Sequence, residues 1–372
     1  MREGWKYQKL GELVKVINGL WVGKKPPFTN VAVVRNANFT KSCTLDMSNI
    51  AYIDVEEKQF NTRELQYADI IIEKSGGSEK QPVGRPVFFN IKDRGYSFSN
   101  FTATLRVVSS DIVPEYLYKV LLAQYKQGVT KRLQSKTTGL HNLDFKSYLK
   151  SVIPIPSCEK QLSIVSELDK INELIRLKKE QLKDYDNLAQ SIFYEMFGDP
   201  VVNEKGWEVK KFADLYKLKS GDSRSAKNFV EGEIPVYGGN GISGYHNDFN
   251  MDGDFIIIGR VGVYCGNVRE VHGKFWLTDN AFQLFYNREI QYPCFIHYLL
   301  EILDLHHYAN AAAQPVISNL TLKDVEIIIP PLPLQQAFAQ RIELIKKQKA
   351  EIQNTIADLE TLLASRMQYW FD

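Results

Sequence analysis

The sequence predicts an α+β protein in which two mixed α and β modules alternate with two long helices. Three observations support this fold class. Much of the sequence occurs twice, two stretches of about 38 residues carry an apolar heptad pattern, and short strand-like runs fill the rest. At 372 residues, the chain is too long for one ordinary core and fits two domains with connecting elements.

The duplication appears at two constant offsets. The segment that opens with Trp5 recurs 202 residues later in the segment that opens with Trp207. The segment Ser191–Phe197 recurs 174 residues later as Ser365–Phe371. Side chains vary between the copies, which suggests two related modules that recognise different things.

The first module is predicted in residues 1–155, with short strands between glycine-rich and polar loops. A helix from Glu115 to Gln124 is expected after Pro114, because proline is favoured at the first turn of a helix. The predicted strands are Asn30–Arg35, Asp69–Ile72, Val87–Phe89 and Ala103–Val108.

The first long helix is predicted in residues 156–198. Pro154 and Pro156 define its start, because proline blocks helical continuation on its N-terminal side. Its apolar positions alternate steps of four and three, a heptad seam interrupted only at Lys178. The seam residues include Ile164, Leu168, Ile171, Ile175, Leu182, Tyr185 and Ile192.

A polar linker and the second module are predicted in residues 199–330, and the second long helix in 331–372. The second module should contain strands at Gly253–Ile258 and Ala281–Phe285 and a helix from Phe295 to His306. The second seam has polar interruptions at Lys349 and Arg366. Its apolar residues include Phe338, Ile342, Ile345, Ile352, Ile356, Leu359 and Leu363. Each helix would be roughly 55 Å long at 1.5 Å per residue.

Composition excludes several classes of protein. Hydrophobic residues at 44% and charged residues at 24% are typical of a soluble globular chain. No membrane-spanning run and no apolar signal segment are visible, so a cytoplasmic location is expected. The net charge of +2 means that DNA binding would require local positive charge or a charged partner subunit. The four cysteines, Cys43, Cys158, Cys265 and Cys294, lack a disulfide or zinc-like pattern, so no metal is expected.

Sequence motifs for catalysis are not convincing. The segment Gly19–Lys25 approaches a phosphate loop but is one residue short and lacks the hydroxyl that would bind magnesium. No amino-methyltransferase motif or glycine-rich cofactor fingerprint is found. We interpret Asp69 and Glu73 as a solvated strand end, not a nuclease site. The pair His306–His307 is interpreted as a surface or capping feature, because adjacent helical side chains diverge by about 100°.

These features together resemble the specificity subunit of type I restriction-modification systems. The matching phrases are Ser75–Ser78 after an apolar strand, Ile153–Pro156 before Gln161, and Phe193–Asp199 at the end of the first helix. The resemblance covers essentially the whole chain. It implies that each module is a target recognition domain that reads one half of a split, asymmetric DNA sequence. It also implies that the two helices form an antiparallel coiled coil with pseudo-two-fold symmetry, which sets the spacer between the halves.

The resemblance also implies partners. Two modification subunits would carry S-adenosylmethionine and methylate adenine, while restriction subunits would use ATP and magnesium to cut DNA. This chain would bind no cofactor and would be non-catalytic. Apolar residues beyond the seam could dock the modification subunits or pack against the modules. They are Leu174, Leu177, Leu188, Phe193, Phe197, Leu344, Leu362 and Phe371.

Candidate DNA contacts are polar loop residues close to strand ends. Arg and Lys can pair with guanine, Asn and Gln with adenine, and hydroxyls and amides with phosphates. In the first module they are Lys74, Ser75, Gly77, Ser78, Lys80, Arg85, Asn100, Thr137 and Thr138. In the second module they are Asn240, Ser243, Tyr245, Arg260, Tyr264, Asp279, Asn280 and Gln314. Gly76–Gly77 and Gly238–Gly239 are expected to let the backbone approach DNA closely.

Two other classes remain open from the sequence. A structural coiled-coil adaptor would need the heptads but not the loop-rich modules, and it would lack salt-dependent DNA affinity. A nuclease or methyltransferase would need a carboxylate cluster or a cofactor site, and the sequence offers neither convincingly.

Overall fold

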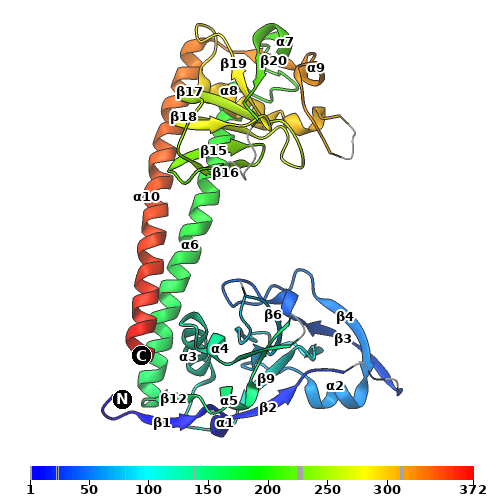
Figure 1. Ribbon diagram of the computed structural model, residues 1–372, viewed down its shortest axis with the longest axis vertical. Helices are drawn as coiled ribbons and strands as arrows, with labels where there is room; N and C mark the ends of the chain where they lie inside the picture. The colour runs from blue at the N-terminus through cyan, green and yellow to red at the C-terminus, as the bar shows by residue number, and fades with distance from the viewer. Residues whose placement is uncertain are drawn as a thin grey trace. The chain divides into compact units, whose positions relative to one another are not determined.

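A computed structural model describes residues 2–21, 23, 25–79, 81–137, 140–223, 229–310 and 314–372. The chain divides into two compact units. Unit 1 comprises Met1–Leu177 and Ile356–Asp372, and unit 2 comprises Lys178–Thr355. Each unit therefore contains the beginning of one long helix and the end of the other (Figure 1).

A two-stranded antiparallel ribbon connects the beginning of each module to the segment before its long helix. In unit 1, β1 (Lys6–Lys9) pairs with β12 (Val152–Ile155). In unit 2, β13 (Glu208–Lys211) pairs with β20 (Glu326–Ile329) in the same register. The members of the two ribbons are related by the offsets of 202 and 174, so the sequence repeat is also a structural repeat.

The central sheet of each unit has the same strand order. In unit 1 the order is β2 (Val14–Asn18), β9 (Thr102–Val107), β5 (Ile70–Glu73) and β7 (Pro86–Phe88). In unit 2 it begins with β14 (Lys217–Ser220), β19 (Ala281–Phe285), β17 (Met251–Gly259) and β18 (Val268–Leu277). The strands predicted in these regions are confirmed with shifts of one or two residues at their ends.

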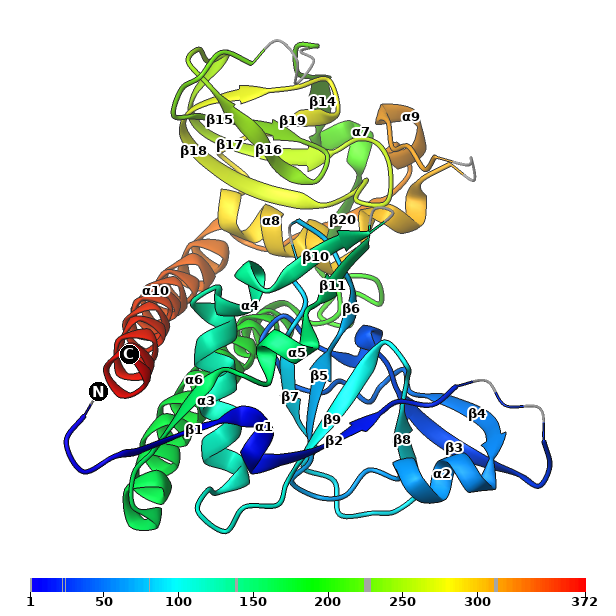
Figure 2. The same cartoon turned by 60° about the horizontal axis from the view of Figure 1, so that its bottom comes forward.

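A second group of strands extends each module. In unit 1, β3 (Phe28–Val34) lies between β4 (Ala51–Glu56) and β8 (Tyr96–Phe98). In unit 2, β15 (Ile234–Gly238) pairs with β16 (Gly241–His246) and, in parallel, with β18. The long strand β18 therefore pairs with both β17 and β15, whereas in unit 1 two strands divide these pairings: β7 pairs with β5, and β8 pairs with β3. Unit 1 also contains a sheet of β10 (Gln134–Thr137), β11 (Leu140–Leu143) and β6 (Ser75–Gly77) (Figure 2).

Two medium-length helices begin at prolines, as predicted: α3 (Pro114–Lys126) and α8 (Pro293–Ile302). The prediction that the second helix would continue to His306 is wrong. Asp304 has a φ of 45°, which is incompatible with a continuing right-handed helix, so a separate 3-10 turn follows. The short helical segments are α1 (Leu10–Leu13), η1 (Asn36–Asn38), α2 (Glu57–Arg63), α4 (Val129–Arg132), α5 (Phe145–Tyr148), α7 (Phe212–Leu215), η3 (Leu305–Tyr308) and α9 (Asn319–Leu322).

The long helices are α6 (Cys158–Phe197) and α10 (Leu332–Phe371), each of 40 residues. A fully buried glutamine anchors the first turn of each helix. The Gln161 Oε1 atom accepts from the Val113 backbone N at 2.8 Å, and its Nε2 atom donates to the carbonyls of Asp111 and Pro156. These bonds fix the start of α6 against the start of α3.

Gln335 makes the equivalent contacts in unit 2. Its Oε1 atom accepts from the Tyr292 N at 2.8 Å, and its Nε2 atom donates to the carbonyls of Ile290 and Pro330. The two modules therefore use the same buried amide to join a long helix to a proline-initiated helix.

The predicted seam positions are mostly buried within their own units. In unit 1, Ile164 and Leu168 are fully buried. Arg366 of α10 forms an ion pair with Glu167 of α6. In unit 2, Lys349 of α10 pairs with Asp186 of α6. Both polar interruptions of the second seam thus face a carboxylate on the other helix, which explains why they are tolerated.

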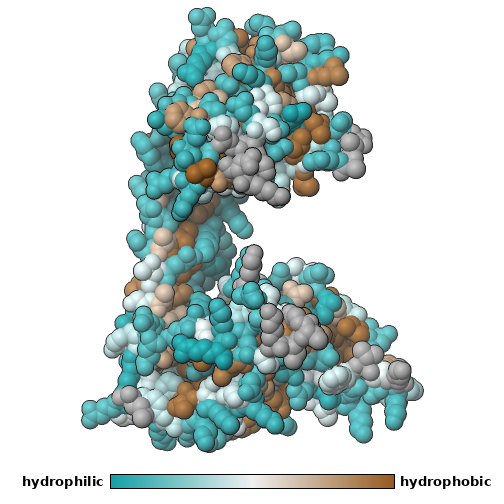
Figure 3. All heavy atoms as spheres, viewed as in Figure 1, coloured by the Kyte–Doolittle hydropathy of each residue, from teal (hydrophilic) through white to brown (hydrophobic). Residues whose placement is uncertain are grey.

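Apolar residues outside the seam divide into two groups. Phe193 and Phe197 are fully buried in the core of unit 2, and Phe371 packs against Tyr116 in unit 1. Five leucines of the predicted set remain exposed, and apolar side chains are visible along the long helices in Figure 3. They are Leu174, Leu177, Leu188, Leu344 and Leu362. Among the described residues, no helix has the length and apolarity needed to cross a membrane.

Candidate functional site

In unit 2, three loops converge at one edge of the six-stranded sheet. The Arg260 N donates to the Asn280 carbonyl at 2.9 Å, which joins the end of β17 to the start of β19. The Gly262 N donates to the Pro315 carbonyl at 2.9 Å, so the segment around Gln314 reaches the same place. Backbone hydrogen bonds therefore gather loops that are distant in sequence.

A fourth loop, which follows β15, packs against the same edge. A Cβ on Gly259 would lie 2.5 Å from the Gly239 carbonyl oxygen and 2.6 Å from that of Tyr264. A Cβ on Gly239 would lie 3.1 Å from the carbonyl oxygens of Asn280 and Val261. Gly239 thus allows close packing between loops, and its predicted close approach to DNA stays a prediction.

The predicted second-module contacts lie in or beside these loops, except Ser243 and Tyr245, which lie on β16. The Arg260 Nη1 atom lies 3.3 Å from both the Ser220 Oγ and the Asp279 carbonyl, and its guanidinium lies over the Phe282 ring. These contacts orient a half-buried cation. Asp279 is half-buried. The exposed members are Asn240, Ser243, Tyr245, Tyr264, Asn280 and Gln314.

Unit 1 contains a corresponding meeting of loops. The backbone N atoms of Lys74 and Ser75 donate to the Phe101 carbonyl at 2.8 and 3.2 Å. The Asn36 Nδ2 atom donates to the Ser75 carbonyl at 2.7 Å. These bonds join the ends of β3 and β5 to the turn before β9.

The turns before β9 and β19 are held in the same way in the two units. A Cβ on Gly19, at the end of β2, would lie 1.9 Å from the Ser99 carbonyl oxygen. A Cβ on Gly221, at the end of β14, would lie 2.3 Å from the Leu277 carbonyl oxygen. Only glycine fits at either position, and both glycines belong to the repeat at offset 202.

The predicted contacts of the first module fall into separate environments. Lys74 is half-buried, its Nζ donates to the Asn18 Oδ1 at 2.8 Å, and burial lowers the pKa of its ammonium group. Ser75 is half-buried beside Asn142. Asn100 and Ser78 are exposed.

The remaining predicted contacts of the first module are either buried or lie outside the described residues. Gly77 is buried, and a Cβ there would lie 2.7 Å from a Val83 methyl group, so this glycine also serves internal packing. Thr137 ends β10, but its side chain lies outside the described residues. Lys80 and Thr138 lie outside them entirely.

Arg85 does not lie on the surface. Only 4% of the residue is exposed, and its guanidinium pairs with the buried carboxylate of Glu73 at 3.1 Å. It also donates to the carbonyls of Phe39 and Thr40. This internal network removes Arg85 from the set of DNA contacts, because its donors already have partners inside unit 1.

The interpretation of Asp69 and Glu73 as a solvated strand end is also wrong. Each is 1% exposed and pairs with an arginine, Asp69 with Arg106 and Glu73 with Arg85. Burial raises the pKa of Glu73, and the contact with Arg85 opposes that rise. Within the described ranges, no group of three or more His, Cys, Asp or Glu side chains could hold a metal ion.

Three residues at the first-module site were missed by sequence reasoning. Asn36 lies two residues after the end of β3, Phe101 precedes β9 and is 46% exposed, and Asn142 lies on β11 beside Ser75. Asn36 was detectable, because a polar residue after an apolar strand is the same signal that selected Ser75. The contribution of Asn142 depends on a non-local strand pairing.

Known proteins with similar sequences share one description. A family model described as the type I restriction modification DNA specificity domain matches residues 2–184 and 204–361. The EcoprrI specificity subunit of Escherichia coli is 29% identical over 220 residues, which cover 55% of this chain and about half, 54%, of that protein. The putative MjaX specificity subunit of Methanocaldococcus jannaschii is 21% identical over an alignment 399 positions long, which covers 97% of this chain and 93% of that protein.

Solved structures agree on the fold. A type I restriction-modification S subunit from M. genitalium aligns with a TM-score of 0.57 and 14% identity, covering 99% of this chain and 96% of that one. A second structure comes from work on complex assembly and conformational transition of the type I restriction-modification system. One of its chains aligns with a TM-score of 0.64 and 17% identity. That alignment covers 100% of this chain and 98% of the other.

Proposed function

The chain belongs to the family of type I restriction modification DNA specificity domains, and we propose that each of its two modules reads one half of a split, asymmetric DNA sequence. The family match falls in both halves of the chain, so the repeat consists of two such modules. One observation supports the proposal most strongly. In each unit, the loop after the central strand, β5 or β17, is hydrogen-bonded to the turn before the neighbouring strand, β9 or β19.

The chemistry of the exposed loops suits readout of base edges. Asn100 in the first module and Asn240, Asn280 and Gln314 in the second offer amides that can pair with adenine. Arg260 and Lys74 offer cations for guanine or phosphate. The two modules present different side chains on similar frameworks, which would make the two half-sites different.

We further propose that α6 and α10 form an antiparallel coiled coil that sets the spacer between the half-sites. Within unit 1, residues near the start of α6 contact residues near the end of α10, as in the Glu167–Arg366 pair. Within unit 2, the end of α6 meets the start of α10, as in the rings of Phe193 and Phe338, 5.7 Å apart. The rigidity of paired helices would hold the spacer length constant.

The partners follow from the family. The exposed leucines of α6 and α10 would dock two modification subunits, since apolar surface that remains unburied commonly marks an interface. Those subunits would carry S-adenosylmethionine, and associated restriction subunits would use ATP and magnesium. The chain itself would act in the cytoplasm as a non-catalytic subunit without a cofactor of its own.

The test is methylome sequencing of cells that carry this chain with its neighbouring modification subunit, compared with cells that lack only this chain. A split adenine-methylated motif that disappears with the chain is the expected result. Stable co-purification of the modification subunit without any chain-dependent motif would contradict the proposal and favour an adaptor.

A further inference from the structure

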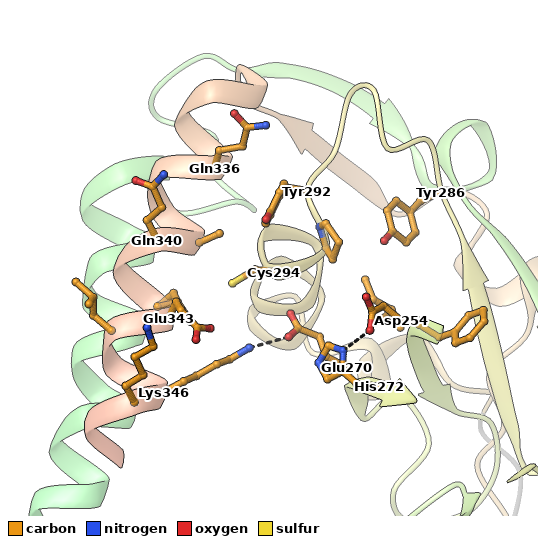
Figure 4. A pocket seen from close by; sticks show the side chains of 17 residues that line it. Asp254, Glu270, His272, Tyr286, Tyr292, Cys294, Gln336, Gln340, Glu343 and Lys346 are labelled. Atoms are coloured by element: carbon orange, nitrogen blue, oxygen red, sulfur yellow. Dashed lines mark hydrogen bonds and ion pairs between the residues drawn. The ribbon is translucent and has the colours of Figure 1, made fainter. Parts of the chain in front are cut away.

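A cleft of about 690 Å³ separates α10 from the sheet of unit 2. Gln336, Gln340 and Glu343 line it from the helix, while Asp254 and His272 line it from β17 and β18 (Figure 4). Polar and charged side chains from the sheet and from α10 therefore line the cleft.

One ion pair joins the sheet to the helix at this cleft. The Lys346 Nζ atom on α10 lies 2.7 Å from the Glu270 Oε2 atom on β18 (Figure 4). The Glu270 side chain is only 11% exposed, and its other oxygen lies 3.6 Å from the His297 Nδ1 atom on α8. The His297 Nε2 atom in turn lies 3.6 Å from a carboxylate oxygen of Glu301. The network therefore joins β18, α8 and α10.

The charges in this network remain in place around neutral pH. Burial acts to raise the pKa of Glu270, but contacts with His297 and Lys346 outweigh it and hold the value at about 2. Burial acts to lower the pKa of His297, but contacts with Glu270 and Glu301 outweigh it and raise the value to about 9. Glu270 therefore stays ionised between two cations.

An apolar core joins the sheet, α8 and the long helices, with Ile256, Phe295 and Ile342 among its buried members. Phe295 of α8 stacks on Phe193 of α6 with ring centroids 5.8 Å apart, and Tyr298 meets Phe338 of α10 at 5.3 Å. These contacts hold α8 on the long helices. The Lys346–Glu270 pair adds an ionic attachment between the sheet and α10 beside this apolar core.

We infer that Lys346, Glu270 and His297 form an ionic strut that fixes the angle of the second module on α10 and thereby narrows the range of DNA gap lengths that the complex accepts. The inference rests on the proposed reading of two half-sites. The three residues are positioning residues, because they lie between the module and its helix rather than among the exposed loops.

A similar attachment in unit 1 uses different residues. Lys119 of α3, which is 8% exposed, pairs with Asp169 of α6. In that unit the proline-initiated helix itself carries the cation, whereas in unit 2 the sheet is joined to the helix through β18. A charged contact between module and long helix is thus present in both units.

The experiment compares the wild-type complex, containing its modification subunits, with complexes carrying Lys346→Met or Lys346→Arg. Initial methylation rates are measured on duplexes whose gap equals that of the wild-type motif, or is one base pair shorter or longer. The Lys346→Met change keeps the aliphatic stem and removes the charge, whereas Lys346→Arg keeps a cation. The matched control is Lys347→Met, at the next, exposed position of the same helix.

Loss of the strut should lower the ratio of kcat/KM on the correct gap to kcat/KM on the altered gaps by about fivefold, within the range expected for a partly exposed ion pair. Lys346→Arg and Lys347→Met should retain the wild-type ratio. A purely stabilising role would instead lower methylation on all duplexes equally and leave the ratio unchanged, which would overturn the inference.

Glu270→Gln provides a second route to the same test if Lys346→Met fails to assemble. It retains the side-chain shape and should reproduce the loss of gap discrimination; an unchanged ratio would again overturn the strut. A wild-type complex that methylates duplexes bearing only one half-site as well as intact sites would refute the proposed function itself, which is a separate outcome.

Discussion

Charged side chains at adjacent strand positions take opposite roles in unit 1. Glu73 and Arg85 pair inside the module, whereas Lys74 lies at the meeting of the loops. Glu73 and Lys74 share one sequence context, an apolar strand followed by a polar turn, whereas Arg85 directly precedes β7. Burial accounts for the different roles of Glu73 and Lys74. A buried charge requires a partner, whereas an exposed or half-exposed charge can bind a ligand.

The substitution Arg85→Ala tests this division. It leaves the Glu73 carboxylate buried without its cation, so the free energy of unfolding should fall by about 3 to 5 kcal/mol. Urea denaturation of the full chain measures this loss. Arg94→Ala, which removes an exposed partner of Glu64, is the control and should change stability little. Unaltered stability combined with weakened DNA binding would return Arg85 to the contact surface.

The ion network around His297 predicts a pH dependence. Its pKa is raised from 6.5 to about 9, so its stabilising contribution is complete below about pH 6.5 and is lost as the pH rises towards 9. The loss should be on the order of 2 kcal/mol. Urea denaturation between about pH 6 and pH 9 measures it, with His297→Gln as the reference for all other titrating groups. Parallel stability curves for the two proteins would contradict the prediction.

At the scale of elements, the buried glutamines predict matched effects in the two modules. Replacing Gln161 or Gln335 with alanine leaves buried backbone groups unpaired and should cost about 1 to 3 kcal/mol each. Hydrogen–deuterium exchange should show faster exchange at the start of α3 for Gln161→Ala and at the start of α8 for Gln335→Ala. The exposed neighbour Gln336 supplies the control. Equal exchange in all variants would argue against the anchoring role.

Much of the element pattern could be predicted from the sequence because local signals determine it. Prolines set the starts of α3 and α8, and the heptad positions predicted which residues of α6 and α10 are buried. The end of α8 was not predictable, because the left-handed backbone of Asp304 follows from its surroundings rather than from a glycine.

The candidate sites were predictable in part, and more so in unit 2. Arg260, Asn280 and Gln314 are brought together by backbone hydrogen bonds between sequence-distant loops, in agreement with their selection as one set. The prediction that Arg85 contacts DNA was wrong, because sequence alone does not reveal that Arg85 pairs with Glu73 inside the module. Local patterns identify polar residues at strand ends, but burial depends on non-local partners.

At the scale of the whole molecule, the small net charge of +2 predicts weak DNA binding by the chain alone. The candidate contacts include few cations besides Lys74 and Arg260, so few phosphates can be neutralised and the slope of log affinity against log salt should be shallower than about −3. The complex with modification subunits should show a steeper slope. Fluorescence anisotropy of a labelled duplex across a salt series measures both. A steep slope for the isolated chain would contradict a dependence on partner charge.

The division of labour between the modules is tested most directly by methylome sequencing of two matched variants, Asn100→Ala and Asn280→Ala. Both asparagines are exposed and lie just before equivalent strands, β9 and β19. Each variant should relax the motif in one half only, a different half for each, by about tenfold at the affected base, and leave the gap unchanged. Relaxation of the same half by both variants, or a motif that changes in both halves at once, would contradict the account.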